Sequence, residues 1–298
     1  MNAQDLFFYW INERHRIFLK REGGESPPFT EDPILQKYKF TNPFRENDRT
    51  TRWLKPHIRD KFEGPDLVWW MCLFRNTGTI EAGIEMLLLD SLANKMVTNF
   101  DEDTLGRCLV EFQERGGKLF TGGYMVTCQY PDAQGKPKII SLLKHCLRHV
   151  YRDKEKLYDF ARKDRTLECF VNRLMCYNGF GGNGFMAYEV ASDLRHTGVL
   201  GDATDIFSWA NPGPGAQRGL SRYFGRYDQA TKNKQIASRK QTVAEMRHLL
   251  DISPMYLEPH VPALEMRDIE HSLCEYDKYM RVLTGEGRPK GLFHGGVF

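Results

Sequence analysis

Paired cysteines are absent from this sequence of 298 residues, although it contains seven cysteines. None of them stands in a CxxC spacing, and their number is odd. A disulfide framework needs an even set of thiols and a zinc site needs closely spaced ligands, so this pattern argues against both. We therefore expect buried, reduced thiols, and we predict neither a metal site nor a cofactor.

Long apolar runs are also missing. A membrane helix needs roughly 18 consecutive apolar residues, whereas runs such as Leu67–Phe74 have only the length of core segments. The first residues become charged too soon for a signal peptide. With 41% hydrophobic and 12% aromatic residues, the composition is that of a globular chain rather than a disordered one. These features predict a cytoplasmic protein without membrane contacts.

The sequence also lacks a strong net charge, because its formal charge is only +3 at pH 7. Basic residues nevertheless gather in four stretches: Arg14–Arg21, Arg45–Arg59, Lys144–Arg165 and Arg218–Lys240. Such stretches suit contacts to DNA phosphates, and they equally suit ordinary solvated helix faces. Charge alone therefore leaves nucleic-acid binding open.

The spacing of apolar residues predicts a mainly α fold. Helices are expected at Leu6–Glu22, from Asp32-Pro33 onward, and at Asp66–Phe74, Thr79–Leu92, Asp101–Arg115, Asp153–Arg162, Arg165–Cys176, Phe185–Leu194, Ala216–Tyr223, Thr242–Leu250 and Met266–Leu283. Arg45, Arg49 and Arg52 have the spacing of residues that share one helical face.

One small β-hairpin is also expected. Tyr124–Tyr130 alternates like a strand, Pro131–Pro137 is rich in turn residues, and Lys138–Leu142 has the length of a returning strand.

A glycine-rich turn joins two of the predicted helices. The first helix ends after Leu174 at the turn Gly179-Phe180-Gly181, and the second runs to Leu194. Glycines permit a left-handed backbone, and the exposed amides of such a turn form a seat for a phosphate. A tight helical hairpin without any ligand has the same pattern, so both interpretations stay open.

A second loop, Asn211–Gly215, leads into the helix that carries Arg218 and Arg222 one turn apart. Free amides, the positive end of a helix dipole and guanidinium groups all suit an anion. The pattern predicts phosphate binding by Gly213, Gly215, Arg218 and Arg222. A rigid turn followed by two surface arginines is the alternative.

The first turn resembles the helix-hairpin-helix of the DNA glycosylase superfamily, in which a hairpin grips the DNA backbone beside a flipped base. The resemblance implies a DNA glycosylase-like, two-lobed helical fold in one domain, residues 1–298, with lobes at 1–150 and 151–298 and the hairpin at 165–194. It also implies DNA contacts from Gly179, Gly181 and Asn183. Asn183 replaces the superfamily's usual catalytic lysine and Gly213 its usual aspartate. Base excision by the usual route is therefore disfavoured.

Five longer motifs resemble another family. They are Asp32–Trp53, Leu73–Asn76, Gly122–Val126, Met266–Tyr279 and Gly285–Pro289. Together they are similar to the α-glutamyl/putrescinyl-thymine pyrophosphorylase-like family of bacteriophages that hypermodify thymine. That family is related to the helical domain of 5-hydroxymethyluracil DNA kinases and to phage amino acid:DNA transferases.

This resemblance implies an amino acid:DNA transferase. Its partners are double-stranded DNA carrying modified thymine, a free amino acid such as glycine, and a 5-hydroxymethyluracil DNA kinase that phosphorylates the base beforehand. The sequence contains no GxxxxGK[ST] loop, which favours a transferase over a kinase. A base-excising glycosylase and a non-catalytic DNA-binding partner of the kinase are the alternatives.

The implied reaction requires a phosphate seat, a base for the attacking amine and contacts to the pyrimidine. We expect Gly213–Gly215 and Arg218 to bind the phosphate, assisted by Arg45 or Arg49. The expected catalytic base is Glu189 or Asp193, which share a helical face. Further candidates for substrate binding or base catalysis are Asn76, Glu270, His271, Glu275 and Lys278. For these acids and their neighbours, surface ion pairs or capping roles are the alternatives.

Overall fold

The computed structural model describes residues 2–93, 95–121, 135–228 and 237–293. They form a mainly α fold, as the sequence predicts. The chain divides into two compact units, and the second is inserted into the first. Unit 1 comprises residues 1–49 and 206–298, and unit 2 comprises residues 50–205. Residue 150, the expected boundary between lobes, lies within a helix of unit 2.

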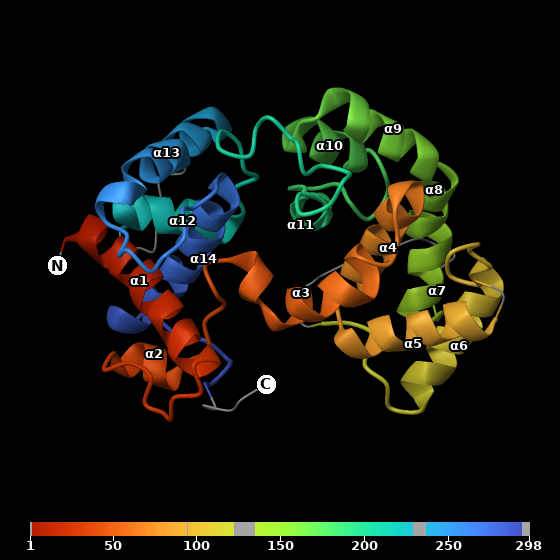
Figure 1. Ribbon diagram of the computed structural model, residues 1–298, viewed down its shortest axis with the longest axis horizontal. Helices are drawn as coiled ribbons and strands as arrows, with labels where there is room; N and C mark the ends of the chain where they lie inside the picture. Colours follow the sequence, from red (N-terminus) through yellow and green to blue (C-terminus); the bar gives the residue numbers. More distant parts are fainter. Residues whose placement is uncertain (1, 94, 122–134, 229–236, 294–298) are drawn as a thin grey trace. The chain divides into compact units, whose positions relative to one another are not determined.

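Unit 1 is built from both ends of the chain (Figure 1). Its helical segments are α1 (Ala3–Glu22), α2 (Pro33–Lys37), the 3-10 turn η1 (Arg45–Asn47), α12 (Pro214–Tyr223), α13 (Arg239–Ile252), the 3-10 turn η5 (Ser253–Met255) and α14 (Met266–Leu283). In its core, the ring of Phe7 meets that of Tyr276 edge-on at 5.5 Å, which joins α1 to α14. Phe8 stacks on Tyr256 at 4.9 Å.

Unit 2 contains the remaining helices, from α3 (Arg49–Leu54), which begins at the unit boundary, to α11. They are the π-helical turn η2 (Lys55–Arg59), α4 (Gly64–Thr77), α5 (Ile80–Leu92), α6 (Glu102–Glu114), α7 (Lys138–Leu142), the π-helical turn η4 (Leu143–Leu147), α8 (Arg148–Arg152), α9 (Lys154–Asp164), α10 (Leu167–Leu174) and α11 (Phe185–Leu194).

Helix α4 is the centre of unit 2. Every residue from Leu67 to Thr77 is buried, as expected for a helix that is apolar on all sides. Helices α8, α9 and α11 pack around it (Figure 1). The helix ends at Gly78, whose φ of +78° suits the left-handed terminal position that glycine adopts most easily. The apolar run of the sequence thus becomes the core on which unit 2 is assembled.

Helices α12 and α14 approach each other unusually closely in unit 1. A Cβ atom on Gly215 would lie 2.3 Å from the Cys274 Sγ, and one on Gly219 would lie 2.2 Å from the backbone oxygen of Leu273. Both distances are far below van der Waals contact. The two glycines, one turn apart, are therefore required for this packing and fix the register of α12 on α14.

The predicted β-hairpin is wrong at its second strand, because Lys138–Leu142 forms helix α7. Buried residues recur at Ile139, Leu142, Leu143 and Cys146, which is the spacing of one helical face. A stretch of five residues is too short to show this helical spacing, which is why the strand prediction fails. The first predicted strand, Tyr124–Tyr130, lies outside the described residues. Within the described ranges there is no strand, only isolated bridges.

The predicted shared face of Arg45, Arg49 and Arg52 is also wrong. Asp48 adopts an extended conformation, with ψ of 140°, between η1 and α3. The three arginines therefore belong to two separate helical segments. None of the helices in the described part of the chain is long and apolar enough to span a membrane.

Candidate active site

The last helix, α14, carries four of the polar residues that the sequence singles out: Glu270, His271, Glu275 and Lys278. Its first turn is closed by reciprocal hydrogen bonds between Glu265 and Asp268, a capping box. Successive residues of an α-helix turn by about 100°. Glu270 and Asp277 therefore share the face that meets α12, whereas His271, Glu275 and Lys278 form the next stripe around the helix.

The second stripe meets the segment that follows α2. The backbone N–H of Thr41 donates a hydrogen bond of 3.0 Å to a carboxylate oxygen of Glu275. The Thr41 hydroxyl lies 2.7 Å from the Nε2 atom of His271. The Lys278 ammonium donates to both Glu275 oxygens, at 2.6 and 2.7 Å. We call Thr41, His271, Glu275 and Lys278 the Glu275 cluster.

Glu275 stays ionised although only 5% of its surface is exposed. Burial by itself would raise its pKa, but the charge of Lys278, followed by His271 and the Thr41 N–H, holds the pKa of Glu275 below its usual range. An ionised carboxylate beside an imidazole stabilises the protonated imidazole. The cluster therefore has the parts of a general base: a histidine, a supporting carboxylate and a hydroxyl that orients the ring.

Arg14 of α1 adds a partly buried positive charge to this region. Its Nε donates to the backbone oxygen of Phe40 at 3.2 Å, while its Nη1 has no hydrogen-bond partner among the described residues. Burial lowers the pKa of Arg14 to about 10, aided by repulsion from Arg21 and opposed by Glu275 and Asp48. An unused guanidinium donor thus lies beside the Glu275 cluster.

Two arginines of α12 converge on Asp277, on the other stripe of α14. Arg222 donates through Nε to Asp277 at 2.9 Å and through both Nη groups to Glu286, at 2.9 and 2.8 Å. Arg218 also reaches Asp277, at 2.8 Å, but only through its Nε. Its side chain is 33% exposed, against 4% for Arg222. Arg222 thus joins α12 to Asp277 and Glu286, whereas the side chain of Arg218 is bonded through its Nε and stays partly exposed.

The charges in this Asp277 network stabilise one another. Burial would lower the pKa of Arg222, but the hydrogen bonds that it donates to Glu286 and Asp277 raise the pKa above its usual value. The bond from Arg222 in turn lowers the pKa of Glu286 to about 2, with Tyr227 and Thr284 contributing. Both partners therefore stay charged at neutral pH.

The predicted phosphate loop is partly occupied by the protein itself. The N–H of Gly213 donates to Glu270 at 3.2 Å, and Arg267 donates to the other oxygen of that carboxylate. Gly215 is buried against Cys274. A carboxylate of α14 therefore stands where the sequence places a phosphate, and the partly exposed Arg218 follows within α12. Arg45, in η1, is partly exposed, and Arg49 is exposed at the first residue of α3.

The glycine-rich turn of unit 2 joins α10 to α11, as predicted. Gly179 has φ of +85°, and its α-carbon packs so close to Cys146 that a Cβ would lie 2.9 Å from Sγ. Gly181 and Asn183 are exposed, and Asn183 accepts a hydrogen bond of 3.2 Å from the N–H of Phe185. The turn therefore combines a buried anchor with an exposed tip.

The two residues expected to act as catalytic base lie inside unit 2. Glu189 is 3% exposed and Asp193 is fully buried. Arg75 donates through two nitrogens to the two oxygens of Asp193, one bond measuring 2.9 Å. Such a bidentate buried pair joins α4 to α11. Arg218 belongs to unit 1, so neither acid shares a unit with the predicted phosphate ligand.

Asn76, expected to contact a pyrimidine, is likewise fully buried. Its amide nitrogen donates to the backbone oxygen of Cys72 at 2.7 Å, while its oxygen has no hydrogen-bond partner among the described residues. The Asn76 side chain thus bonds back to the preceding turn of its own helix, α4.

Thr41 is not singled out by the sequence, and Arg14 is named there only as the first residue of a basic stretch. Thr41 falls inside the N-terminal motif Asp32–Trp53, yet nothing in its neighbours marks it. Its partners lie more than 200 positions away in the chain. In the described part of the molecule, no group of three or more histidine, cysteine or acidic side chains is arranged to hold a metal ion.

The sequence matches the family described as the helical domain of 5-hmdU DNA kinase over residues 1–288. It is 24% identical over 300 residues to the 5-hmdU DNA kinase of Bacillus phage SP10. That match covers 95% of this chain and 45% of the kinase, so the chain spans less than half the length of this relative. No solved structure matches. Because the family match covers nearly all of the residues, the chain belongs to the family of the 5-hmdU DNA kinase helical domain.

Proposed function

We propose that this chain modifies thymine-derived bases in phage DNA as an amino acid:DNA transferase. It replaces the phosphate of 5-phosphomethyl-deoxyuridine in DNA with the amine of a free amino acid. Two facts support the proposal: a relative is a phage kinase named for 5-hmdU in DNA, and a histidine, an ionised carboxylate and a hydroxyl meet at α14. A 5-hydroxymethyluracil DNA kinase supplies the phosphorylated base, in the cytoplasm of the infected host.

In the proposed reaction the amine nitrogen attacks the methylene carbon on C5 of the base. The C–N bond forms as the C–O bond to the phosphate breaks, and the phosphate leaves with the electron pair of that bond. One N–H proton passes to the imidazole of His271. Glu275 stays ionised and stabilises the imidazolium, while Thr41 orients the ring through its hydrogen bond.

The leaving phosphate needs donors placed where its negative charge develops. Arg218 is suited to this role because its Nε is held by Asp277 while its side chain stays partly exposed. Arg45 or Arg49 assists. The DNA is held at the exposed tip Gly181–Asn183 of the glycine-rich turn, through backbone amides, in the manner of a helix-hairpin-helix.

The observation that carries this assignment is the 2.7 Å contact between His271 Nε2 and the Thr41 hydroxyl beside a buried, ionised Glu275. A simple surface ion pair needs neither the histidine nor the hydroxyl.

The test is to incubate the protein with DNA containing 5-phosphomethyl-uracil and each amino acid in turn, and to analyse the nucleosides by mass spectrometry. The proposal expects a nucleoside in which the amino acid replaces the phosphate on the methylene carbon, heavier than 5-hydroxymethyl-deoxyuridine by one amino acid residue, together with released phosphate. Release of the free base instead would identify a glycosylase. DNA affinity with a steep salt dependence and no product with any amino acid would identify a non-catalytic binding partner.

A further inference from the structure

The peptide group between Phe40 and Thr41 is held from both sides in unit 1. Its oxygen accepts a hydrogen bond of 3.2 Å from the Nε of Arg14, and its N–H donates one of 3.0 Å to a carboxylate oxygen of Glu275. The oxygen and the nitrogen of one peptide group are only about 2.3 Å apart. The Arg14 Nε and the bonded Glu275 oxygen are therefore within about 9 Å of each other, so Arg14 borders the Glu275 cluster.

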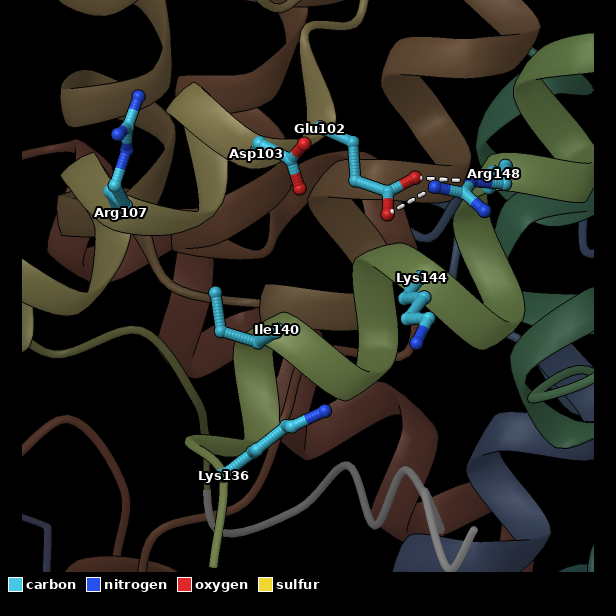
Figure 2. A pocket seen from close by; sticks show the side chains of 7 residues that line it. All are labelled: Glu102, Asp103, Arg107, Lys136, Ile140, Lys144 and Arg148. Atoms are coloured by element: carbon cyan, nitrogen blue, oxygen red, sulfur yellow. Dashed lines mark hydrogen bonds and ion pairs between the residues drawn. The ribbon is translucent and has the colours of Figure 1, made fainter. Parts of the chain in front are cut away.

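Arg14 differs from an arginine that already has an acidic partner. In a pocket of unit 2, Arg148 donates to both oxygens of Glu102 (Figure 2). Arg14 donates instead to a neutral backbone oxygen, and its Nη1 atom is buried without a hydrogen-bond partner among the described residues. A buried charged donor without an acceptor destabilises the protein, and an anionic oxygen that reaches the donor removes this cost. Arg14 therefore has a binding capacity that the described residues leave unused.

A second donor without an acceptor lies in the same segment of the chain. Asn42 is 4% exposed, and its side-chain oxygen accepts a hydrogen bond of 2.9 Å from the N–H of Phe44, which fixes the orientation of the amide. The Nδ2 atom of Asn42 has no hydrogen-bond partner among the described residues. One charged and one neutral donor thus adjoin the segment 40–42, and both lack an acceptor oxygen.

The charges around these donors suit a zwitterion. Glu275 and Asp48 are the acids whose charge acts on Arg14, and Arg21 repels it. Neither acid bonds to Arg14, and Glu275 is held by Lys278. A free α-amino acid carries its amine and its carboxylate on one carbon atom. With a hydrogen bond of about 2.9 Å at each end it spans about 9 Å, which is comparable to the separation of Arg14 from Glu275.

We propose that Arg14 and Asn42 bind the carboxylate of the amino acid whose amine is the nucleophile. The amine end of the same molecule then faces His271 and Glu275. This inference rests on the proposed function and adds the substrate class to it: α-amino acids react, and amines without a carboxylate react poorly. Arg14 and Asn42 are binding residues in this assignment and take no proton.

The test compares the transfer of glycine with that of glycinamide, which lacks the negative charge. An amino acid that is transferred in place of glycine is compared with its own amide. The ratio of kcat/KM for the two nucleophiles is measured for wild type, Arg14→Gln and Arg107→Gln, since a comparison of ratios cancels the different basicity of the amines. Arg107 is the control because it is an exposed arginine of unit 2 that donates to Thr104 (Figure 2).

We expect Arg14→Gln to lower this ratio by about 10- to 100-fold, the effect of losing a hydrogen bond to a charged group. The loss should be in the KM for glycine, with kcat little changed. Arg14→Lys keeps the charge and should recover part of the ratio, and Arg107→Gln should match the wild type. Asn42→Asp keeps the oxygen that accepts from Phe44 but replaces the donor with a negative charge, so it should lower the ratio as well. Unfolding midpoints of all variants exclude loss of fold.

An unchanged ratio in both Arg14→Gln and Asn42→Asp would overturn the inference and leave the proposed transferase in place. An equal loss with glycine and glycinamide would assign Arg14 to the leaving phosphate and would also overturn it. If the wild type transfers no amino acid at all, the proposed function fails, and calorimetric titration of glycine decides the inference separately. Glycine binding that is lost in Arg14→Gln and kept in Arg107→Gln would retain the carboxylate site, whereas no binding to the wild type would overturn both.

Discussion

Two buried carboxylates, Asp193 in unit 2 and Glu275 in unit 1, are both ionic partners of a basic side chain, yet their surroundings differ. Asp193 is held at both oxygens by Arg75, a rigid bidentate pair between two helices. Glu275 is held by the lysine ammonium and by a backbone N–H, and it lies beside His271, which is bonded to a hydroxyl. Burial of an acid therefore does not identify a catalytic group. A neighbour that can exchange a proton is the more informative feature.

The largest expected effect is a loss of stability on removal of Asp193, the acid that we assign to structure rather than to catalysis. Asp193→Ala leaves the Arg75 guanidinium buried without this carboxylate, which should cost about 3–5 kcal/mol of unfolding free energy. Chemical denaturation followed by circular dichroism measures this loss. Thr166→Ser, which keeps the hydroxyl that caps α10 in the same unit, serves as the control and should change stability little. A loss below about 1 kcal/mol for Asp193→Ala would show that the pair does not hold α4 to α11.

The Asp277 network likewise contains one residue that we assign to the reaction, Arg218, and one that stabilises the fold, Arg222. Arg218→Ala should reduce amino acid transfer by about 10²–10³-fold, the usual loss when one donor to a developing negative charge is removed. Its fold should persist, because Arg222 still neutralises Asp277. Arg222→Ala should instead lower the unfolding midpoint, since it leaves Asp277 and Glu286 without their shared partner. Single-turnover assays and denaturation curves of both variants provide the comparison. Near-normal transfer by Arg218→Ala would end its assignment as the phosphate ligand.

Two glycines at the start of α12, Gly213 just before the helix and Gly215 in its first turn, allow a test that separates packing from ligand binding. Gly215→Ala places a methyl group 2.3 Å from the Cys274 Sγ and should cost about 1–3 kcal/mol of stability through overpacking. At Gly213 the nearest atom to an added Cβ is a Glu270 oxygen at 3.6 Å, an ordinary contact. Gly213→Ala should therefore be nearly neutral. Thermal unfolding of both proteins checks this order, and an equal effect at both positions would contradict the close approach of α12 and α14.

The last expected effect is a dependence of stability on pH, which is confined to acid conditions. The pKa of Glu286 in the folded chain is about 2, because Arg222 donates to its carboxylate, whereas a glutamate in the unfolded chain has its ordinary pKa of about 4.3. The folded pKa is the lower one, so the stabilisation is present above about pH 4.3 and is lost as the pH falls toward 2. Unfolding free energies of wild type and Glu286→Gln should converge across that interval. Parallel curves would exclude Glu286 as the titrating group.

Much of the helical arrangement is predictable from local sequence. The bounds of α11 and α14 coincide with their predicted ranges, because a glycine precedes the first and a clear apolar period runs through the second. The strand prediction for Lys138–Leu142 is wrong because five residues are too few to distinguish a strand from a helix. Its continuation through Leu143–Leu147 supplies the period that decides the question.

The residues of the proposed site can be selected from the sequence by their type, but the contacts between them cannot. His271, Glu275, Lys278 and Arg218 are candidates on the sequence alone, since basic and acidic residues at helical spacing suit proton and phosphate chemistry. Their selection over Glu189 and Asp193 depends on Thr41, which reaches α14 only through folding. The occupation of the Gly213 amide by Glu270 is likewise a long-range contact that no local pattern encodes.

The most direct test of the central claim is the single-turnover rate of amino acid transfer by His271→Ala on DNA containing 5-phosphomethyl-uracil, with Thr41→Ser as the control that keeps the hydroxyl. If His271 accepts the amine proton, its removal should slow transfer by about 10²–10⁴-fold at an unchanged unfolding midpoint, while Thr41→Ser stays close to the wild type. Equal rates for His271→Ala and wild type would contradict the assignment of the reaction to α14.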